Sequence, residues 1–174
     1  LAGLSKVSYE DAMKFAKSLE TDENGRIKNA VCSIYAEHGT AEQHPYFINS
    51  SKEIEGYEKY GFVMNYGKYL KKQENKVIKE ALSVLADISK NEEAWWMRMT
   101  GINVLADLEE MYKNRIHIAE KELKSLKAGD DKELELRNTL TESEKIKKNI
   151  TTIINDIKET EKNPRLRKMM GLKD

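Results

Sequence analysis

The chain has 174 residues, enough to bury a core of its own, and its 30 basic residues balance its 30 acidic residues. With zero formal net charge it lacks the basic excess typical of nucleic-acid-binding proteins. No apolar run approaches the roughly 18 residues of a membrane-spanning helix. We therefore expect no nucleic-acid partner and no membrane segment. The chain begins at Leu1 without a methionine, so we also expect a fragment of a larger protein.

Apolar residues recur at intervals of three and four through the first half of the chain, which predicts amphipathic helices. Ser8 followed by Asp11 resembles a helix-capping box. Gly61 and Gly67 fall inside one expected helix, where each costs roughly 1 kcal/mol relative to alanine. We expect that neighbouring helices pack closely against these glycines. The expected helices cover residues 8–20, 26–38, 45–54, 56–73 and 75–90.

Two longer helices are expected in the second half, over residues 92–128 and 131–162, with a turn at Ala128-Gly129-Asp130 between them. Their apolar positions follow heptad-like intervals of four and three, interrupted at Lys147. A short turn between long helices predicts an antiparallel hairpin. The last residues, around Leu166 and Met169, are expected to dock as a short cap.

The expected fold is therefore all-α. Residues 1–110 would form HEAT-like antiparallel helix pairs, as in an ARM-type α-solenoid. Residues 111–174 would add the long antiparallel hairpin and the C-terminal cap within the same domain.

Two stretches carry a resemblance to a known family: GYEKYGFVMNYGKYL at 56–70 and ALSVLADISKNEEAWWMRM at 81–99. Both resemble the C-terminal helical region of bacterial zinc aminopeptidases of the membrane alanyl aminopeptidase (gluzincin) family, as do YAEHG at 35–39 and PYF at 45–47. The resemblance spans roughly residues 27–108. It implies a HEAT-like α-solenoid that closes over the active-site cavity of a separate catalytic domain.

The zinc-binding motif of that family, His-Glu-x-x-His, is absent from this sequence. The stretch Gly61-Phe62-Val63-Met64-Asn65 only superficially echoes the Gly-x-Met-Glu-Asn motif of the family, because it lacks the glutamate. We therefore expect no catalytic residue, no metal ligand and no cofactor in this fragment. The resemblance places the zinc in the missing catalytic domain.

The remaining residues with reactive side chains favour structural roles. His38, His44 and His117 are scattered, which favours helix-end or surface histidines over a metal site. Cys32 is the only cysteine and lies in an apolar stretch, so we expect it to be a small, buried hydrophobic residue. A single cysteine leaves the cellular compartment open, whether cytoplasmic or exported.

Aromatic residues supply the candidate interface. Trp95 and Trp96 lie about 100° apart on a helix, and the apolar spacing favours Trp95 in the core and Trp96 at the edge. Tyr57 shares a face with Tyr60, and Tyr66 shares one with Tyr69. These rings could line a peptide groove, but packing in the core and between helices is the favoured interpretation. The candidate interface or groove residues are Trp96, Tyr57 and Tyr66.

Two functions remain open from the sequence. The first is a non-catalytic C-terminal helical domain of a zinc metallo-aminopeptidase, which closes over the active-site cavity and shapes substrate access. Its partners would be the catalytic domain of the same chain and, as a second candidate, peptide substrates. The alternative is a free-standing helical-repeat adaptor that binds proteins or peptides.

Overall fold

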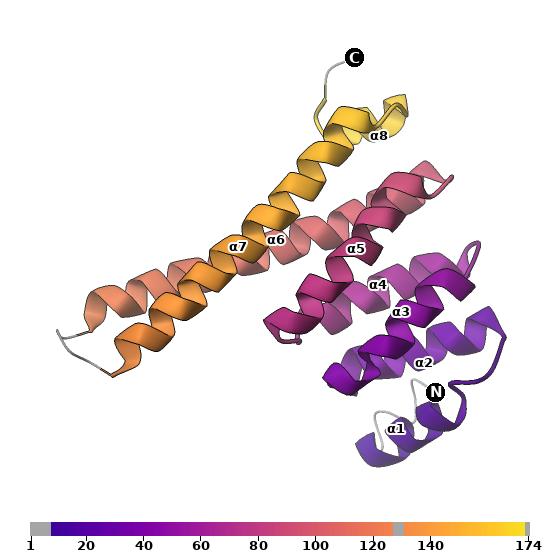
Figure 1. Ribbon diagram of the computed structural model, residues 1–174. Coiled ribbons are helices and arrows are strands. Elements are labelled where there is room, and N and C mark those ends of the chain that lie inside the picture. The colour runs from indigo at the N-terminus through magenta and orange to yellow at the C-terminus, as the bar shows by residue number, and fades with distance from the viewer. Residues whose placement is uncertain (1–7, 127–130, 173–174) are drawn as a thin grey trace. The chain divides into compact units, whose positions relative to one another are not determined.

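The computed structural model describes residues 8–126 and 131–172, and every regular element within these ranges is a helix (Figure 1). The all-α prediction is thus confirmed for this part of the chain. The turn expected at 128–130 lies outside it. The elements are α1 (Tyr9–Ser18), α2 (Gly25–His38), the short 3₁₀ helix η2 (Ala41–Gln43), α3 (His44–Glu53), α4 (Glu58–Leu70), α5 (Asn75–Asn91), α6 (Trp95–Ser125), α7 (Lys132–Thr160) and α8 (Pro164–Met169).

The chain divides into two compact units, Leu1–Val104 and Leu105–Asp174. The division falls inside α6, slightly before the boundary expected after residue 110. Unit 1 contains α1 to α5 and the start of α6, and unit 2 contains the rest of α6 with α7 and α8.

Side-chain caps set several helix starts. The Ser8 hydroxyl accepts a hydrogen bond from the Asp11 backbone N–H at 3.3 Å, so the predicted cap of α1 is present. Helix α6 begins at Trp95 rather than near residue 92, because Glu92 has an extended backbone that ends α5. The Arg98 guanidinium donates to the Glu92 carbonyl at 2.7 Å and to that of Glu93 at 3.0 Å, which satisfies backbone acceptors in this break.

Stacked aromatic rings form the centre of unit 1. Phe47 of α3 lies 4.4 Å from the Tyr69 ring and 5.1 Å from the Tyr66 ring, measured between centroids, and all three side chains are fully buried. Phe62 of α4 joins them at 6.3 Å from Phe47. These rings are large and buried together, so each removes a large apolar area from water.

Glycines allow the helices of unit 1 to approach closely, as expected from the sequence. A Cβ atom placed on Gly67 of α4 would lie 2.8 Å from Cγ2 of Val104 in α6. One placed on Gly61 would overlap the side chain of Asn29 in α2. Helix α4 therefore has close neighbours on more than one side, and the two glycines offset their poor helix propensity by this contact.

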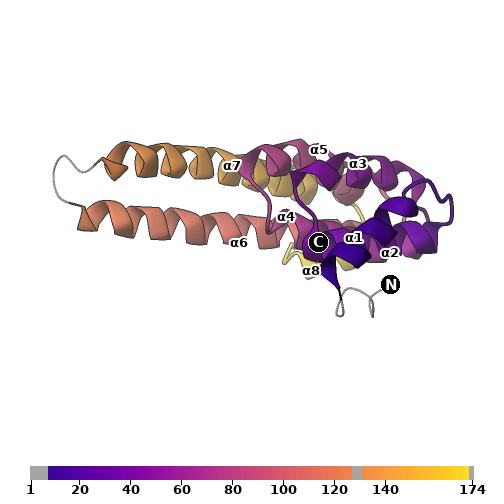
Figure 2. The ribbon, with the colours of Figure 1, turned by 90° about the horizontal axis from the view of Figure 1, so that it is seen from below.

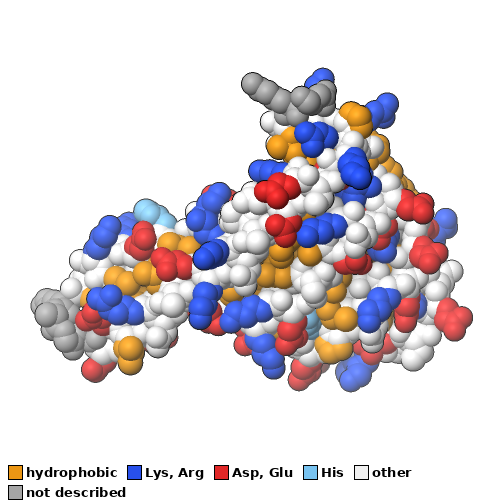
Figure 3. Space-filling model, turned by 45° about the horizontal axis from the view of Figure 1, so that its top comes forward, with side chains coloured by type: hydrophobic (Ala, Val, Ile, Leu, Met, Phe, Trp, Pro, Cys, Tyr) orange, Lys and Arg blue, Asp and Glu red, His pale blue; other side chains and the backbone are white. Residues whose placement is uncertain are grey.

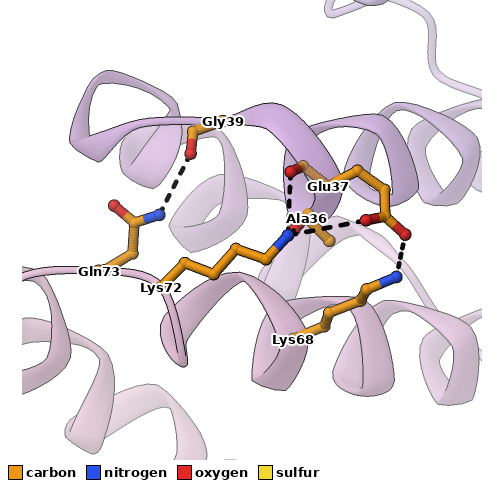
Figure 4. Close-up of polar contacts among 6 residues, drawn as sticks. All are labelled: Ala36, Glu37, Gly39, Lys68, Lys72 and Gln73. Carbon is orange, nitrogen blue, oxygen red and sulfur yellow. Dashed lines mark hydrogen bonds and ion pairs between the residues drawn. The ribbon is translucent and has the colours of Figure 1, made fainter. Parts of the chain in front are cut away.

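The C-terminal end of α2 is tied to the end of α4 by side chains (Figure 4). Lys72 Nζ donates to the carbonyl of Ala36 at 3.0 Å and to that of Glu37 at 2.9 Å. Gln73 Nε2 donates to the carbonyl of Gly39 at 3.2 Å. The last carbonyls of a helix have no partner within that helix, so these bonds have a capping role.

Unit 2 is a helical hairpin with a short C-terminal helix. Figure 2 shows α6 and α7 side by side along this hairpin. The buried face of α7 differs from the expected one at Lys147, which is half-buried while Ile146 is fully buried. Leu166 of α8 is buried, whereas Met169 is 56% exposed. The buried residues of α7 are Ser143, Ile146, Ile150, Ile154 and Ile157.

Candidate interaction surface

Three aromatic rings of unit 1 lie next to one another on the surface. Tyr57 and Tyr60 are 6.2 Å apart between ring centroids, and Trp96 lies 6.4 Å from Tyr57 and 6.3 Å from Tyr60. Their exposed fractions are 76% for Tyr57, 40% for Tyr60 and 37% for Trp96. We call this group the three-ring surface. Large aromatic side chains that remain accessible together are typical of interaction sites.

The packing of α4 against α6 brings these rings together. Gly67 contacts Val104 near one end of the pair, and Tyr60 contacts Trp96 near the other. The earlier residue of α4, Tyr60, contacts the earlier residue of α6, Trp96, and the later residue of α4 contacts the later residue of α6. The two helices therefore run parallel, and their N-terminal ends are neighbours. Gly56, with a φ of 61°, provides the turn that leads into α4. The rings of the N-terminal turns therefore gather at one place.

A hollow of about 520 Å³ opens beside the rings. Lys59 forms an ion pair with Glu92, and their side chains are 15% and 26% exposed. Glu55 and Glu93 also line the hollow, are exposed, and have no ion pair with the described residues. The hollow thus has aromatic walls and an excess of negative charge. Its lining comprises Glu55, Gly56, Tyr57, Lys59, Glu92, Glu93, Ala94, Trp96 and Met97.

Charge is distributed differently over the wider surface. In the face drawn in Figure 3, acidic and basic side chains are interspersed rather than gathered into one patch of a single sign. This arrangement agrees with a chain of 30 basic and 30 acidic residues. The hollow beside the three rings is therefore distinguished by its local combination of rings and carboxylates.

The structure joins two of the three candidate interface residues and separates the third. Tyr57 and Trp96 belong to the three-ring surface, but Tyr66 is fully buried. The possible groove role of Tyr66 is therefore wrong, and its packing in the core agrees with the interpretation favoured for these tyrosines. Tyr60 and Tyr66 lie about 120° apart around α4, at about 100° per residue, so they face different neighbours. Tyr60, which its spacing places on the same helix face as Tyr57, also belongs to this surface.

The tryptophan pair also differs from the expectation. Trp95 is only half-buried, so neither tryptophan is a core residue. The core position of this turn is occupied by Met97, which is 2% exposed. Helix α6 begins at Trp95 itself, so its first turn is packed on fewer sides than a helix interior.

His44 is buried within a hydrogen-bonded chain that links three helices. Its Nε2 lies 2.9 Å from the Tyr66 hydroxyl, and its Nδ1 lies 3.3 Å from a carboxylate oxygen of Glu80. His44 begins α3 but is only 4% exposed, so it is a core histidine rather than a surface one. Burial lowers the pKa of His44, and the nearby Glu80 carboxylate opposes this shift. The chain joins α3, α4 and α5 from within.

Cys32 is also buried, as the sequence predicts. Its exposed fraction is zero, and burial raises the pKa of its thiol to about 12. The side chain therefore remains a protonated thiol near neutral pH and behaves as a small apolar group. Among the described residues, no three His, Cys, Asp or Glu side chains are grouped so that they could hold a metal ion.

None of the described helices combines the length and apolar character needed to cross a bilayer. Comparison of the chain with protein families, with curated proteins and with solved structures finds no match. The three-ring surface, and the sequence stretches that build it, therefore carry the functional interpretation.

Proposed function

We propose that this chain is the non-catalytic C-terminal helical domain of a zinc metallo-aminopeptidase. In this proposal its helix pairs form a HEAT-like solenoid that closes over the active-site cavity and shapes substrate access. The zinc and the reacting groups belong to a catalytic domain outside residues 1–174. The proposal is supported first by the resemblance of the stretches at 56–70 and 81–99 to that family.

The three-ring surface is the observation that carries the proposal. Tyr57 and Tyr60 come from the first of the two resembling stretches, and Trp96 comes from the second. The residues behind the resemblance thus meet at one accessible aromatic surface. A domain that packs against the rest of its own chain needs such a surface, because buried aromatic anchors contribute most to interfaces between proteins and between domains.

The chemistry of the described side chains fits a structural role. His44 and Tyr66 are committed to each other inside the core, and Cys32 is a buried thiol with a raised pKa. A general base must be able to reach the proton that it removes from a substrate. These groups are closed off from solvent by their burial.

A free-standing adaptor is the second candidate, and the hollow beside the rings favours it. About 520 Å³ lined by Tyr57, Trp96 and carboxylates is enough space for a side chain of a bound peptide. In that case the partner would be a separate protein, and the rings would stay accessible in the natural polypeptide until the partner binds.

Side-chain footprinting separates the two candidates. The natural polypeptide that contains residues 1–174 and the isolated chain are oxidised by hydroxyl radicals, and labelling is read at Tyr57 and Trp96. We expect labelling of both residues to fall at least about threefold in the natural polypeptide, because rings buried in a domain interface exclude water. Tyr66, which is fully buried, and Tyr9, which is 53% exposed, are the internal references. Equal labelling of Tyr57 and Trp96 in the two proteins would favour the adaptor.

A further inference from the structure

The hollow beside the three-ring surface combines two features that favour the same kind of ligand. Aromatic faces attract cations, because the ring quadrupole is negative above and below the plane. Tyr57 and Trp96 line the hollow. The centroid of the Tyr60 ring lies 6.2 Å from that of Tyr57 and 6.3 Å from that of Trp96. A cation placed over this group would be within reach of more than one ring.

The carboxylates of the hollow add to this preference. The positive charge of Lys59 is taken up by Glu92, so this pair contributes little net charge. Glu55 and Glu93 remain as exposed carboxylates without an ion pair to the described residues. Arg98 is not part of the lining, but its guanidinium donates to the backbone carbonyls of Glu92 and Glu93 and keeps its positive charge, so one negative charge remains in excess around the hollow. The side chains that line the hollow therefore leave an excess of negative charge.

Another hollow of similar size, on the hairpin of unit 2, lacks this combination. It measures about 480 Å³ and is lined by Lys147 and Lys148 as well as by Glu120 and Glu144, with Ile116 as its large apolar residue. Its charges are balanced and it contains no aromatic ring. Nothing in its lining selects one class of ligand.

We infer that the hollow beside the three-ring surface binds the side chain of an arginine carried by a polypeptide segment outside this chain. The guanidinium stacks on the aromatic faces and donates its N–H groups to the carboxylates of Glu55 and Glu93. Arginine suits this place better than lysine, because its planar group can stack and form paired hydrogen bonds at once. The inference rests on the proposed function and names the partner of the hollow: the arginine is carried by a segment of the catalytic domain of the same polypeptide.

The test uses the isotope-labelled chain and the peptide acetyl-Gly-Arg-Gly-amide, followed by the NMR signal of the Trp96 indole N–H. We expect a saturable shift of this signal. The same peptide with neutral citrulline in place of arginine should bind at least about fivefold more weakly, as expected when cation–π and charge-assisted bonds are lost. A peptide with trimethyl-lysine should also bind more weakly, because it cannot donate hydrogen bonds.

Matched variants locate the site. Tyr57→Ala and the double variant Glu55→Gln/Glu93→Gln should each weaken arginine binding about fivefold. Both change exposed side chains, so the fold should be retained. The control variants Tyr9→Ala and Glu23→Gln change exposed residues outside the hollow and should bind like the original chain.

Equal binding of the arginine and citrulline peptides, tighter binding of the trimethyl-lysine peptide, or unchanged binding by the double glutamate variant would each overturn the inference. So would the absence of a saturable shift at Trp96. None of these results bears on the footprinting experiment, which asks only whether the rings are covered in the natural polypeptide.

Discussion

Replacement of Phe47 by alanine is expected to lower the free energy of unfolding of the chain by about 3–5 kcal/mol, the usual cost of truncating a buried phenylalanine. The ring is fully buried and stacks on Tyr69 and Tyr66 with centroids 4.4 and 5.1 Å away. Removing it leaves a cavity among rigid aromatic neighbours, which cannot collapse to fill the space. Urea denaturation followed by tryptophan fluorescence measures the loss, because both tryptophans lie in unit 1.

Phe15→Ala is the matched control for this prediction. The same side chain is removed, but Phe15 on α1 is 46% exposed. Its loss should cost less than about 1 kcal/mol, as for most partly exposed positions. If Phe15→Ala proved as damaging as Phe47→Ala, the aromatic cluster would not be the centre of unit 1.

Replacement of Gly67 by leucine should lower the free energy of unfolding by about 2–3 kcal/mol. A Cβ atom at this position would lie 2.8 Å from Val104 Cγ2 and 3.0 Å from Val104 Cγ1, so the larger side chain forces α4 away from α6. Overpacking of a closed contact typically costs 1–3 kcal/mol. The gain in helix propensity over glycine, about 1 kcal/mol at most, is too small to compensate.

A double variant tests whether the clash with Val104 is the cause. Adding Val104→Ala to Gly67→Leu should recover part of the loss, with a coupling free energy of at least about 0.5 kcal/mol, as is usual for residues in contact. Gly25→Ala should be tolerated, because its Cβ would make only an ordinary contact, at 3.8 Å from Glu58 Cβ. Strictly additive effects of the Gly67 and Val104 changes would contradict the close packing described here.

The helices were largely predictable from the sequence because apolar spacing and capping residues are local signals. The start of α6 was not, since Glu92 and Glu93 are good helix formers and the break depends on Arg98 reaching back to their carbonyls. The buried face of α7 was misplaced at Lys147 for a related reason. Counting heptads along the sequence does not show that Ile146, rather than Lys147, is the residue buried on this face of α7.

The interaction surface was predictable only in part. The spacing of tyrosines shows which rings share a face of α4, but not which face a neighbouring helix covers. Tyr66 is buried because α3 presents Phe47 and His44 to it. The meeting of Tyr60 with Trp96 depends on the parallel packing of α4 and α6, which no pattern within either helix encodes.

In the proposed role, this chain is the non-catalytic domain of a zinc aminopeptidase. The decisive measurement is zinc-dependent hydrolysis of aminoacyl-arylamides, compared between the natural polypeptide that contains residues 1–174 and the isolated chain. We expect hydrolysis by the natural polypeptide, which a chelator abolishes and zinc restores, and no hydrolysis by the isolated chain. Turnover by the isolated chain, or a natural polypeptide without zinc-dependent turnover, would contradict the proposed role.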